Sequence, residues 1–278
     1  MQRRYRVVVS SQHLLPSSVV RSQMTLASIR AFLRSTAPCR LVGNGRLKGF
    51  QRQCNGKLVG TKLRGLTKLL TSIYGTKPLP SITRSSNGPR PGRAWSGRGG
   101  GRKRGAAVDA QISAIINGSR AKSKRNLRLT NTTLAALKKE ALRPVIAQRS
   151  VLYDRHGCIA SAADFMAVRG DNELVVVELK CGFVNGRTAA VTTNGRTQHM
   201  RAPLTRATDC VLHRHMAQLA TTHRMFVSER GTMRRLRDEF GIDQVSGMLV
   251  YVDDEAVEFV ELTDWWKKKG SAILSAVV

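Results

Sequence analysis

The chain has 278 residues, and its 47 Lys and Arg against 18 Asp and Glu give a formal net charge of +29. A balance this basic favours a polyanionic partner such as nucleic acid. No apolar stretch reaches the roughly 18 to 20 residues of a membrane span, and no Gly-rich ATP loop is present, so we expect neither a membrane partner nor ATP-driven motor activity.

The charge is divided unevenly along the chain. Residues 1–108 contain 22 basic residues and no acidic one, whereas residues 109–278 have a net charge of only +7. The basic part has few aromatic and many Gly, Ser and Pro residues, a composition that resists compaction. We therefore expect residues 41–104 to be a largely disordered basic linker and residues 105–278 to form one α/β domain.

Residues 1–40 have the composition of an organellar presequence. Arginines are spaced among Ser, Leu, Val and Ala without any acid, and Met24 to Thr36 could form an amphipathic helix with Leu26, Ile29 and Leu33 on one side. This favours the mitochondrial matrix, with the nucleus or a virus-infected cell as alternatives. A basic tail that is never removed explains the same pattern.

A second basic element lies at residues 98–105, where a run of three glycines is followed by Arg102, Lys103 and Arg104. It is typical of a flexible hinge with a phosphate-binding patch. Because it directly precedes the expected domain, it could feed DNA towards a site there. Two helices are expected next, over Val108–Ile116 and Thr130–Arg143.

Three extended segments follow, at Ser150–Tyr153, Cys158–Val168 and Glu173–Lys180. The turns expected between them are Asp154–Gly157 and Arg169–Asn172. Since side chains alternate along a strand, Glu178 and Lys180 share one face. Asp164 lies on the preceding strand, about 4.8 Å away, so both carboxylates can reach one ion.

This set of residues is suited to phosphodiester hydrolysis. Mg²⁺ prefers oxygen ligands and is usually held by one or two carboxylates, here Asp164 and Glu178, with Mn²⁺ as a possible substitute. A metal so placed stabilises charge on the phosphate and acidifies a bound water. Lys180 would orient or deprotonate that water, with its pKa lowered by desolvation and the metal. An exposed cross-strand charge pair is the alternative for Glu178 and Lys180.

The loop over about residues 183–204 contains Arg187, Arg196 and Arg201 among Thr and Gly, which indicates contacts to a DNA backbone. A helix is expected at Cys210–Phe226. Strands are expected at Met225–Ser228, Gly247–Asp253 and Ala256–Leu262, before a terminal helix that opens with Trp265 and Trp266, which are expected to be hydrophobic anchors.

Ser161-Ala162-Ala163-Asp164 and Glu178-Leu179-Lys180 resemble the two motifs of the PD-(D/E)XK nuclease superfamily. Ala163 stands where the signature has proline. The resemblance covers about residues 104–262 and is to the branch of lambda-type and RecB-type exonucleases. It implies a restriction-endonuclease-like core, a mixed central β-sheet flanked by helices.

The same resemblance implies roles for three further residues. Glu140 resembles an acidic residue that a helix before the hairpin presents, to hold a second ion or a water. Gln218 resembles the glutamine beside the metal site and would orient Lys180 or a phosphate. The Leu179 carbonyl would help ligate the metal. Thr222 stands where a RecB-type nuclease has tyrosine. Glu140 and Gln218 could equally be ordinary helix residues.

The histidines and cysteines do not form a metal motif. His213 and His215 are two apart on an expected helix, whereas a helical zinc pair needs a spacing of four. The five cysteines contain no C-x-x-C pair, which favours reduced thiols.

The sequence thus predicts a Mg²⁺-dependent DNA exonuclease of replication, repair or recombination. A catalytically silent nucleic-acid-binding scaffold with the same fold is the alternative. A sequence-specific endonuclease would need base-reading elements that the sequence does not reveal.

Overall fold

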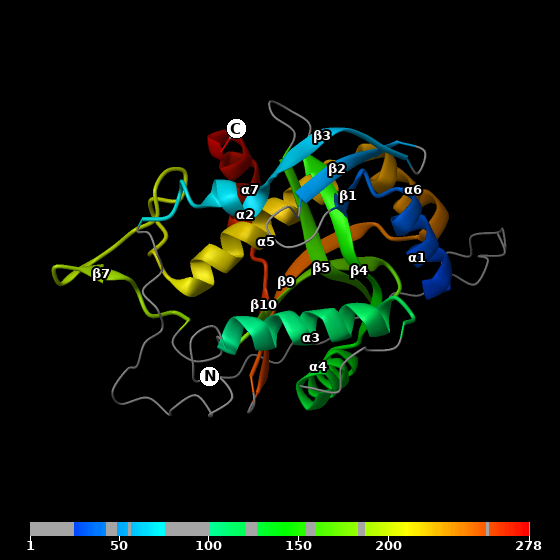
Figure 1. Cartoon of the computed structure of the whole chain (residues 1–278), viewed down its shortest axis with the longest axis horizontal. Helices are drawn as coiled ribbons and strands as arrows, with labels where there is room; N and C mark the ends of the chain where they lie inside the picture. Colours follow the sequence, from blue (N-terminus) through cyan, green and yellow to red (C-terminus); the bar gives the residue numbers. More distant parts are fainter. Residues whose placement is uncertain are drawn as a thin grey trace, which may run out of the picture.

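A mixed β-sheet with helices on both faces forms the centre of the computed structural model of the chain (Figure 1). The structure describes residues 25–42, 49–54, 57–75, 100–119, 127–153, 159–182, 187–253 and 256–277. The prediction of an α/β fold with a mixed central sheet is confirmed. Parts of the predictions rest on the expected turn at Asp154–Gly157, on residues 1–24 and on residues 76–99, all of which lie outside the described residues.

Five strands make the centre of the sheet. They are β4 (Leu142–Tyr153), β5 (Ile159–Arg169), β6 (Glu173–Cys181), β9 (Gln244–Val252) and β10 (Val257–Glu261). β4, β5 and β6 are antiparallel, β9 runs parallel to β6, and β10 is antiparallel to β9. The valines of β6 are fully buried on both faces of the sheet, as expected for a central strand.

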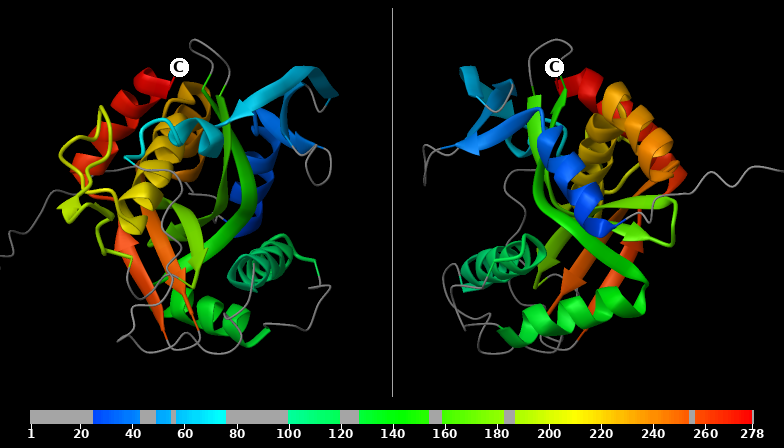
Figure 2. Two further views of the ribbon diagram at one scale, coloured as in Figure 1. Left: turned by 60° about the vertical axis from the view of Figure 1, so that its left-hand side comes forward. Right: turned by 90° about the vertical axis from the view of Figure 1, so that its right-hand side faces the viewer.

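The parallel step from β6 to β9 requires a crossover, and two helices provide it. α5 (Val211–Val227) packs on one face of the sheet, α6 (Arg230–Phe240) follows it, and α7 (Asp264–Val277) returns beside α5 (Figure 2). Gly270 lets α7 approach α5, because a Cβ there would lie 2.5 Å from the Ala220 carbonyl oxygen. The prediction of a strand at Met225–Ser228 was wrong, because these residues form the last turn of α5 and its C-cap, Ser228. The helix α6 was not predicted from the sequence.

The opposite face is covered by α3 (Gly100–Ile116) and α4 (Leu127–Lys139). α3 begins at Gly100, so the expected flexible hinge is largely helical. α4 ends before Arg143, the expected end of this helix, because the chain reverses at Ala141, whose φ is 54°. The reversal places Leu142 at the start of β4.

Residues 25–75, which we call the N-terminal arm, contain regular structure where a largely disordered linker was expected from residue 41 onwards. The arm consists of α1 (Leu26–Ser35), β1 (Cys39–Val42), β2 (Gly49–Cys54), β3 (Lys57–Gly65) and α2 (Leu66–Leu70). β3 joins the sheet by pairing with the first residues of β5. The arm is ordered because its apolar side chains, among them Ile29, Leu33 and Leu70, are fully buried in the α5 face of the core while its charges stay outside. The amphipathic helix expected within residues 24–36 is confirmed as α1.

The loop before α5 contains a small hairpin of β7 (Thr192–Thr193) and β8 (Arg196–Thr197). Its first residues, 183–186, lie outside the described part. Among the helices described, none combines the length and apolarity that crossing a membrane requires.

Candidate functional site

The central feature of the site is a separation between β5 and β6. Their ladder ends at the pair Phe165 and Val177, so Asp164 and Glu178 lie just beyond the last paired residues. Asp164 Oδ2 accepts a hydrogen bond of 2.7 Å from the Leu179 amide, replacing a ladder bond with a side-chain bond. The face alternation of β5 also resets here, since Ala163 packs on the α5 face and Phe165 on the α3 face. Asp164 therefore lies in the opening between the two strands.

Glu178, Lys180 and Gln218 form a closed hydrogen-bonded group beside this opening. Lys180 Nζ and Gln218 Nε2 each donate to Glu178 Oε1 at 2.6 Å, and Lys180 Nζ also donates to Gln218 Oε1 at 3.3 Å. The Glu178 side chain is 3% exposed and that of Lys180 16%. α5 supplies Gln218 and β6 the other two, so the structure brings together four of the predicted site residues, Asp164 included.

The ionisation of the site follows from this crowding. Burial, and then the neighbouring Glu178 carboxylate, raises the pKa of Asp164 well above its ordinary value. Burial by itself would lower the pKa of Lys180, but the Glu178 and Asp164 carboxylates outweigh it and raise that pKa. Lys180 is thus an ammonium ion in this arrangement, contrary to the expectation that its pKa would be lowered.

A third carboxylate approaches from α3. Asp109 adds to the raised pKa of Asp164, after burial and Glu178, and its Oδ1 accepts a 3.2 Å hydrogen bond from Gln148 Nε2. Glu140 was expected to supply the helix-borne acid, but it is exposed in the turn after α4 and makes no bond to the site residues above. The signal that could have indicated Asp109 is its place as the first acidic residue of the chain.

The carboxylate set fits a magnesium ion in its chemistry. Asp164 Oδ1 and Glu178 Oε2 are not used by the bonds described above, and Mg²⁺ is commonly held by one or two carboxylates with water in its other positions. Within the described residues no three His, Cys, Asp or Glu side chains come close enough to form a metal-binding group. Leu179, expected to offer its carbonyl, contacts Asp164 through its amide.

Tyr74, from the end of the N-terminal arm, also belongs to the site. Arg214 stacks on its ring with the guanidinium carbon 4.6 Å from the centroid. Burial raises the pKa of Tyr74 to about 12, and Arg214 and Lys180 act against the shift. Thr222, which stands where RecB-type nucleases have tyrosine, instead shares a 3.0 Å hydrogen bond with Ser161. No local sequence signal marks Tyr74, although it is the only aromatic residue between positions 51 and 94.

Buried polar pairs support the site from α5. Arg214 forms two hydrogen bonds to the fully buried Asp209, at 2.5 and 2.6 Å. His215 lies 3.0 Å from the Tyr251 hydroxyl, and burial lowers the pKa of this histidine well below 6.5. His215 is therefore neutral and available for packing and hydrogen bonding.

The residues predicted to contact DNA fall into three groups. Lys103 is exposed and Arg104 half-buried on the first turns of α3, which also contain Arg102; there Gly105 approaches Cys181, with 3.5 Å between their Cβ positions. Arg196 and Arg201 are exposed on the loop before α5.

Arg187, by contrast, is already engaged. It pairs with Glu258 and stacks on Tyr251, so its charge is at least partly balanced within the protein.

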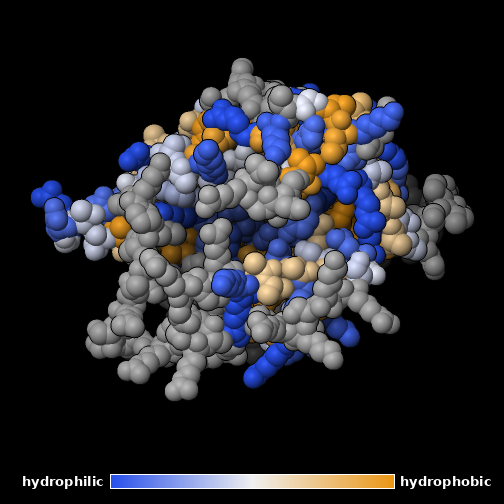
Figure 3. Space-filling model, viewed as in Figure 1, coloured by the Kyte–Doolittle hydropathy of each residue, from blue (hydrophilic) through white to orange (hydrophobic). Residues whose placement is uncertain are grey.

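The face seen in Figure 1 contains a hydrophilic hollow between α3 and the strands β2 and β3, as Figure 3 shows in the same view. One cleft of about 570 Å³ reaches this region and is lined by residues that include Arg40, Asn117, Gln148 and Ala162. Gln148, which lines this cleft, donates a hydrogen bond to Asp109, so the cleft and the acidic residue of α3 share a neighbour.

No family model and no curated protein matches the chain. Among solved structures, a likeness was found to one titled "Crystal structure of SSO0001", with 14% identity, 62% of this chain and 74% of that chain covered, and a TM-score of 0.25. A score this low is no basis for assigning a fold or a function, so the site has to be judged on its own geometry.

Proposed function

We propose that the chain is a Mg²⁺-dependent DNA nuclease with a restriction-endonuclease-like core, acting as an exonuclease in replication, repair or recombination. The observation that carries this proposal is the arrangement of Asp164, Glu178, Lys180 and Gln218 around the opening between β5 and β6. An isolated E-X-K would be weak support. A half-buried lysine hydrogen-bonded to both Glu178 and Gln218, beside an aspartate whose pKa is raised by burial, is a concentration of perturbed ionisable groups of the kind found at catalytic sites.

Each residue has a role in this proposal. Asp164 and Glu178 would hold Mg²⁺ through their remaining oxygens, with Asp109 as a further acidic group nearby. The ion would supply charge stabilisation at the phosphate. Gln218 fixes the Glu178 carboxylate and the Lys180 ammonium relative to each other.

Lys180 acts as a cation in this proposal. Its pKa is raised, so it would hold a proton at neutral pH and donate hydrogen bonds to the attacking water or to a phosphate oxygen. Proton removal from the water would then fall to another group or to solvent.

One observation favours the rival function, a catalytically silent nucleic-acid-binding scaffold. Glu178 is already balanced by Lys180 and Gln218 without any ion, and the described residues contain no cluster of three metal-binding side chains. A buried and satisfied ion pair can persist for structural reasons alone.

Nuclease assays would separate the two functions. They are done on the full chain, because the N-terminal arm is part of the core. Wild type, Lys180→Ala and the control Lys138→Ala, at an exposed position of α4, are incubated in Mg²⁺ with end-labelled linear duplex, single-stranded and circular DNA and with RNA. We expect mononucleotides from linear DNA with wild type and Lys138→Ala, and binding without cleavage by Lys180→Ala. Binding without cleavage by all three proteins, in Mg²⁺ and in Mn²⁺, would establish the scaffold.

A further inference from the structure

The N-terminal arm has only one sign of charge. Every charged residue between positions 25 and 75 is Lys or Arg. From residue 109 onwards the chain contains acidic as well as basic residues, as on α6, where Arg235 pairs with Glu239. An ordered surface with no carboxylate of its own attracts anions from outside.

The strand register sorts the arm's side chains onto two faces. Arg40, Gln51 and Lys62 are aligned across β1, β2 and β3, and Leu41, Phe50 and Leu63 form the next row. Because neighbouring residues on a strand point to opposite faces, the basic row and the apolar row lie on opposite sides of this sheet.

Arg64, two residues beyond Lys62, shares the basic side of β3. Arg40, Lys62 and Arg64 are all exposed. The basic side of the arm's sheet is thus its solvent side.

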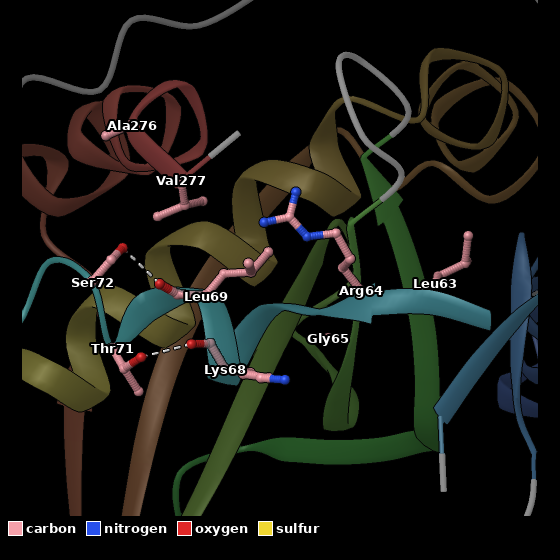
Figure 4. Close-up of a pocket in the computed structure, with 9 residues that line it drawn as sticks. All are labelled: Leu63, Arg64, Gly65, Lys68, Leu69, Thr71, Ser72, Ala276 and Val277. Atoms are coloured by element: carbon pink, nitrogen blue, oxygen red, sulfur yellow. Dashed lines mark hydrogen bonds between the residues drawn. The ribbon is translucent and has the colours of Figure 1, made fainter. Parts of the chain in front are cut away.

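A cleft of about 640 Å³ continues this surface at the junction of β3, α2 and the end of α7. Arg64 extends from β3 towards the space beside Leu69 and Val277, and Lys68 extends from α2 (Figure 4). The hydroxyls of Thr71 and Ser72 donate to the carbonyls of Lys68 and Leu69, so they are not available as donors to a ligand. Arg64 and Lys68 are therefore the charged groups of the cleft, and both are cations of the kind that contact phosphate.

A short segment of the chain links the cleft to the candidate active site. Leu70 and Ile73 are buried against the α5 face of the core, which fixes α2 in place. The next residue, Tyr74, lies under Arg214 and close enough to Lys180 to influence its pKa. Only five residues thus separate Lys68 in the cleft from Tyr74 in the site.

We propose that the basic side of the N-terminal arm and its cleft, with Arg64 and Lys68 as principal contacts, bind the phosphate backbone of the nucleic-acid strand that is cut at Lys180. This inference rests on the proposed function for the fate of the strand. It assigns to the arm a backbone contact that carries no sequence information, as phosphate contacts in general do.

Binding measured across a salt series tests the proposal. Fluorescence anisotropy of an end-labelled oligonucleotide is recorded in EDTA with the full chain, with Arg64→Gln/Lys68→Gln, and with the control Arg230→Gln/Arg234→Gln, whose exposed arginines have the same four-residue spacing on α6. Each lost phosphate contact lowers the slope of log K against log salt by about 0.7 to 0.9, so the cleft variant should lose roughly 1.4 to 1.8 and the control should not change. Equal slopes for the cleft variant and wild type, or equal losses in both variants, would overturn the proposal.

Two further measurements keep this outcome separate from the proposed function. Binding in EDTA does not depend on catalysis, so a silent scaffold that uses the cleft would still show the slope change. If the chain is a nuclease, the cleft variant should lose activity on long strands and keep its activity on a dinucleotide. Binding of wild type to anionic phospholipid vesicles but not to oligonucleotides would reject the nucleic-acid assignment.

Discussion

Asp164 illustrates at the scale of one residue how a side chain can end a strand pairing and occupy the position where the pairing stops. Its carboxylate takes the Leu179 amide, which would otherwise seek a backbone partner. The hydrogen bond between the Leu179 amide and Asp164 therefore bridges the opening between β5 and β6, and it holds the carboxylate at a fixed position there. This arrangement gives the site its preorganisation.

Neutral substitutions can show whether Asp109 on α3 or Glu140 after α4 is the acidic residue that matters for activity. Under the proposed function, Asp109→Asn should reduce Mg²⁺-dependent cleavage about 10-fold, because it removes a negative charge that acts on Asp164 beside the expected ion, and losing an outer group of this kind typically has an effect of this size. Glu140→Gln should leave the rate unchanged, since Glu140 is exposed and away from the bonded group. Initial rates across a Mg²⁺ titration measure both effects. A loss in the Glu140 variant alone would restore the original assignment of Glu140.

His223 should make the stability of the fold sensitive to acid. Burial lowers its pKa below the ordinary 6.5, and its Nε2 lies 3.1 Å from the Val245 carbonyl oxygen. As pH falls below 6.5, His223 is protonated in the unfolded chain but stays neutral in the folded chain, so the free energy of unfolding decreases. In His223→Gln, which can donate to the same carbonyl without titrating, the unfolding temperature should fall less between about pH 7.5 and about pH 5.5. Identical pH dependence in both proteins would argue against this role.

At the scale of elements, the short helix α2 is predicted to anchor the N-terminal arm. Leu70 is fully buried against the core, whereas Leu58 on β3 is 42% exposed. Leu70→Ala should therefore reduce the free energy of unfolding by about 2 to 5 kcal/mol. Leu58→Ala should change it by less than about 0.5 kcal/mol. Chemical denaturation of the full chain measures both, and equal small effects would mean that the arm does not share the core.

The elements differ in how far the sequence could predict them. β6 and the helix containing Gln218 have unambiguous patterns, a valine run and a long amphipathic segment, and both were predicted within a residue or so of their bounds. α6 was missed because its sequence is dominated by arginine, and only its Thr232 and Leu236 are buried. Short patterns of this kind do not distinguish a helix from a loop.

The candidate site was predictable where the chemistry is local. Asp164, Glu178 and Lys180 lie on consecutive strands, so spacing alone places them together. Asp109 and Tyr74 reach the site from distant parts of the chain, through packing that no local pattern encodes. Glu140 was chosen for its place on an expected helix, but Ala141 ends the helical region and leaves Glu140 exposed in the turn.

At the scale of the whole molecule, charge and apolar packing proved to be separate properties of the same segment. The N-terminal arm has the composition of a disordered basic linker, yet its apolar residues recur at positions that meet α5 and β4. The net charge reflects the Lys and Arg residues at the surface, whereas folding depends on the few apolar residues that are buried. The positive charge of the N-terminal arm thus lies on the surface of ordered structure.

The way α1 is built into the fold limits how the chain could be matured by proteolysis. Its Arg30 donates a 2.7 Å bond to the Val145 carbonyl, and Phe32 packs on Phe240 with ring centroids 5.1 Å apart. A protease that removed a targeting leader at residue 40 would excise this helix and expose the apolar surface beneath it. Any leader compatible with this fold must therefore be cut upstream of Thr25, the residue that caps α1.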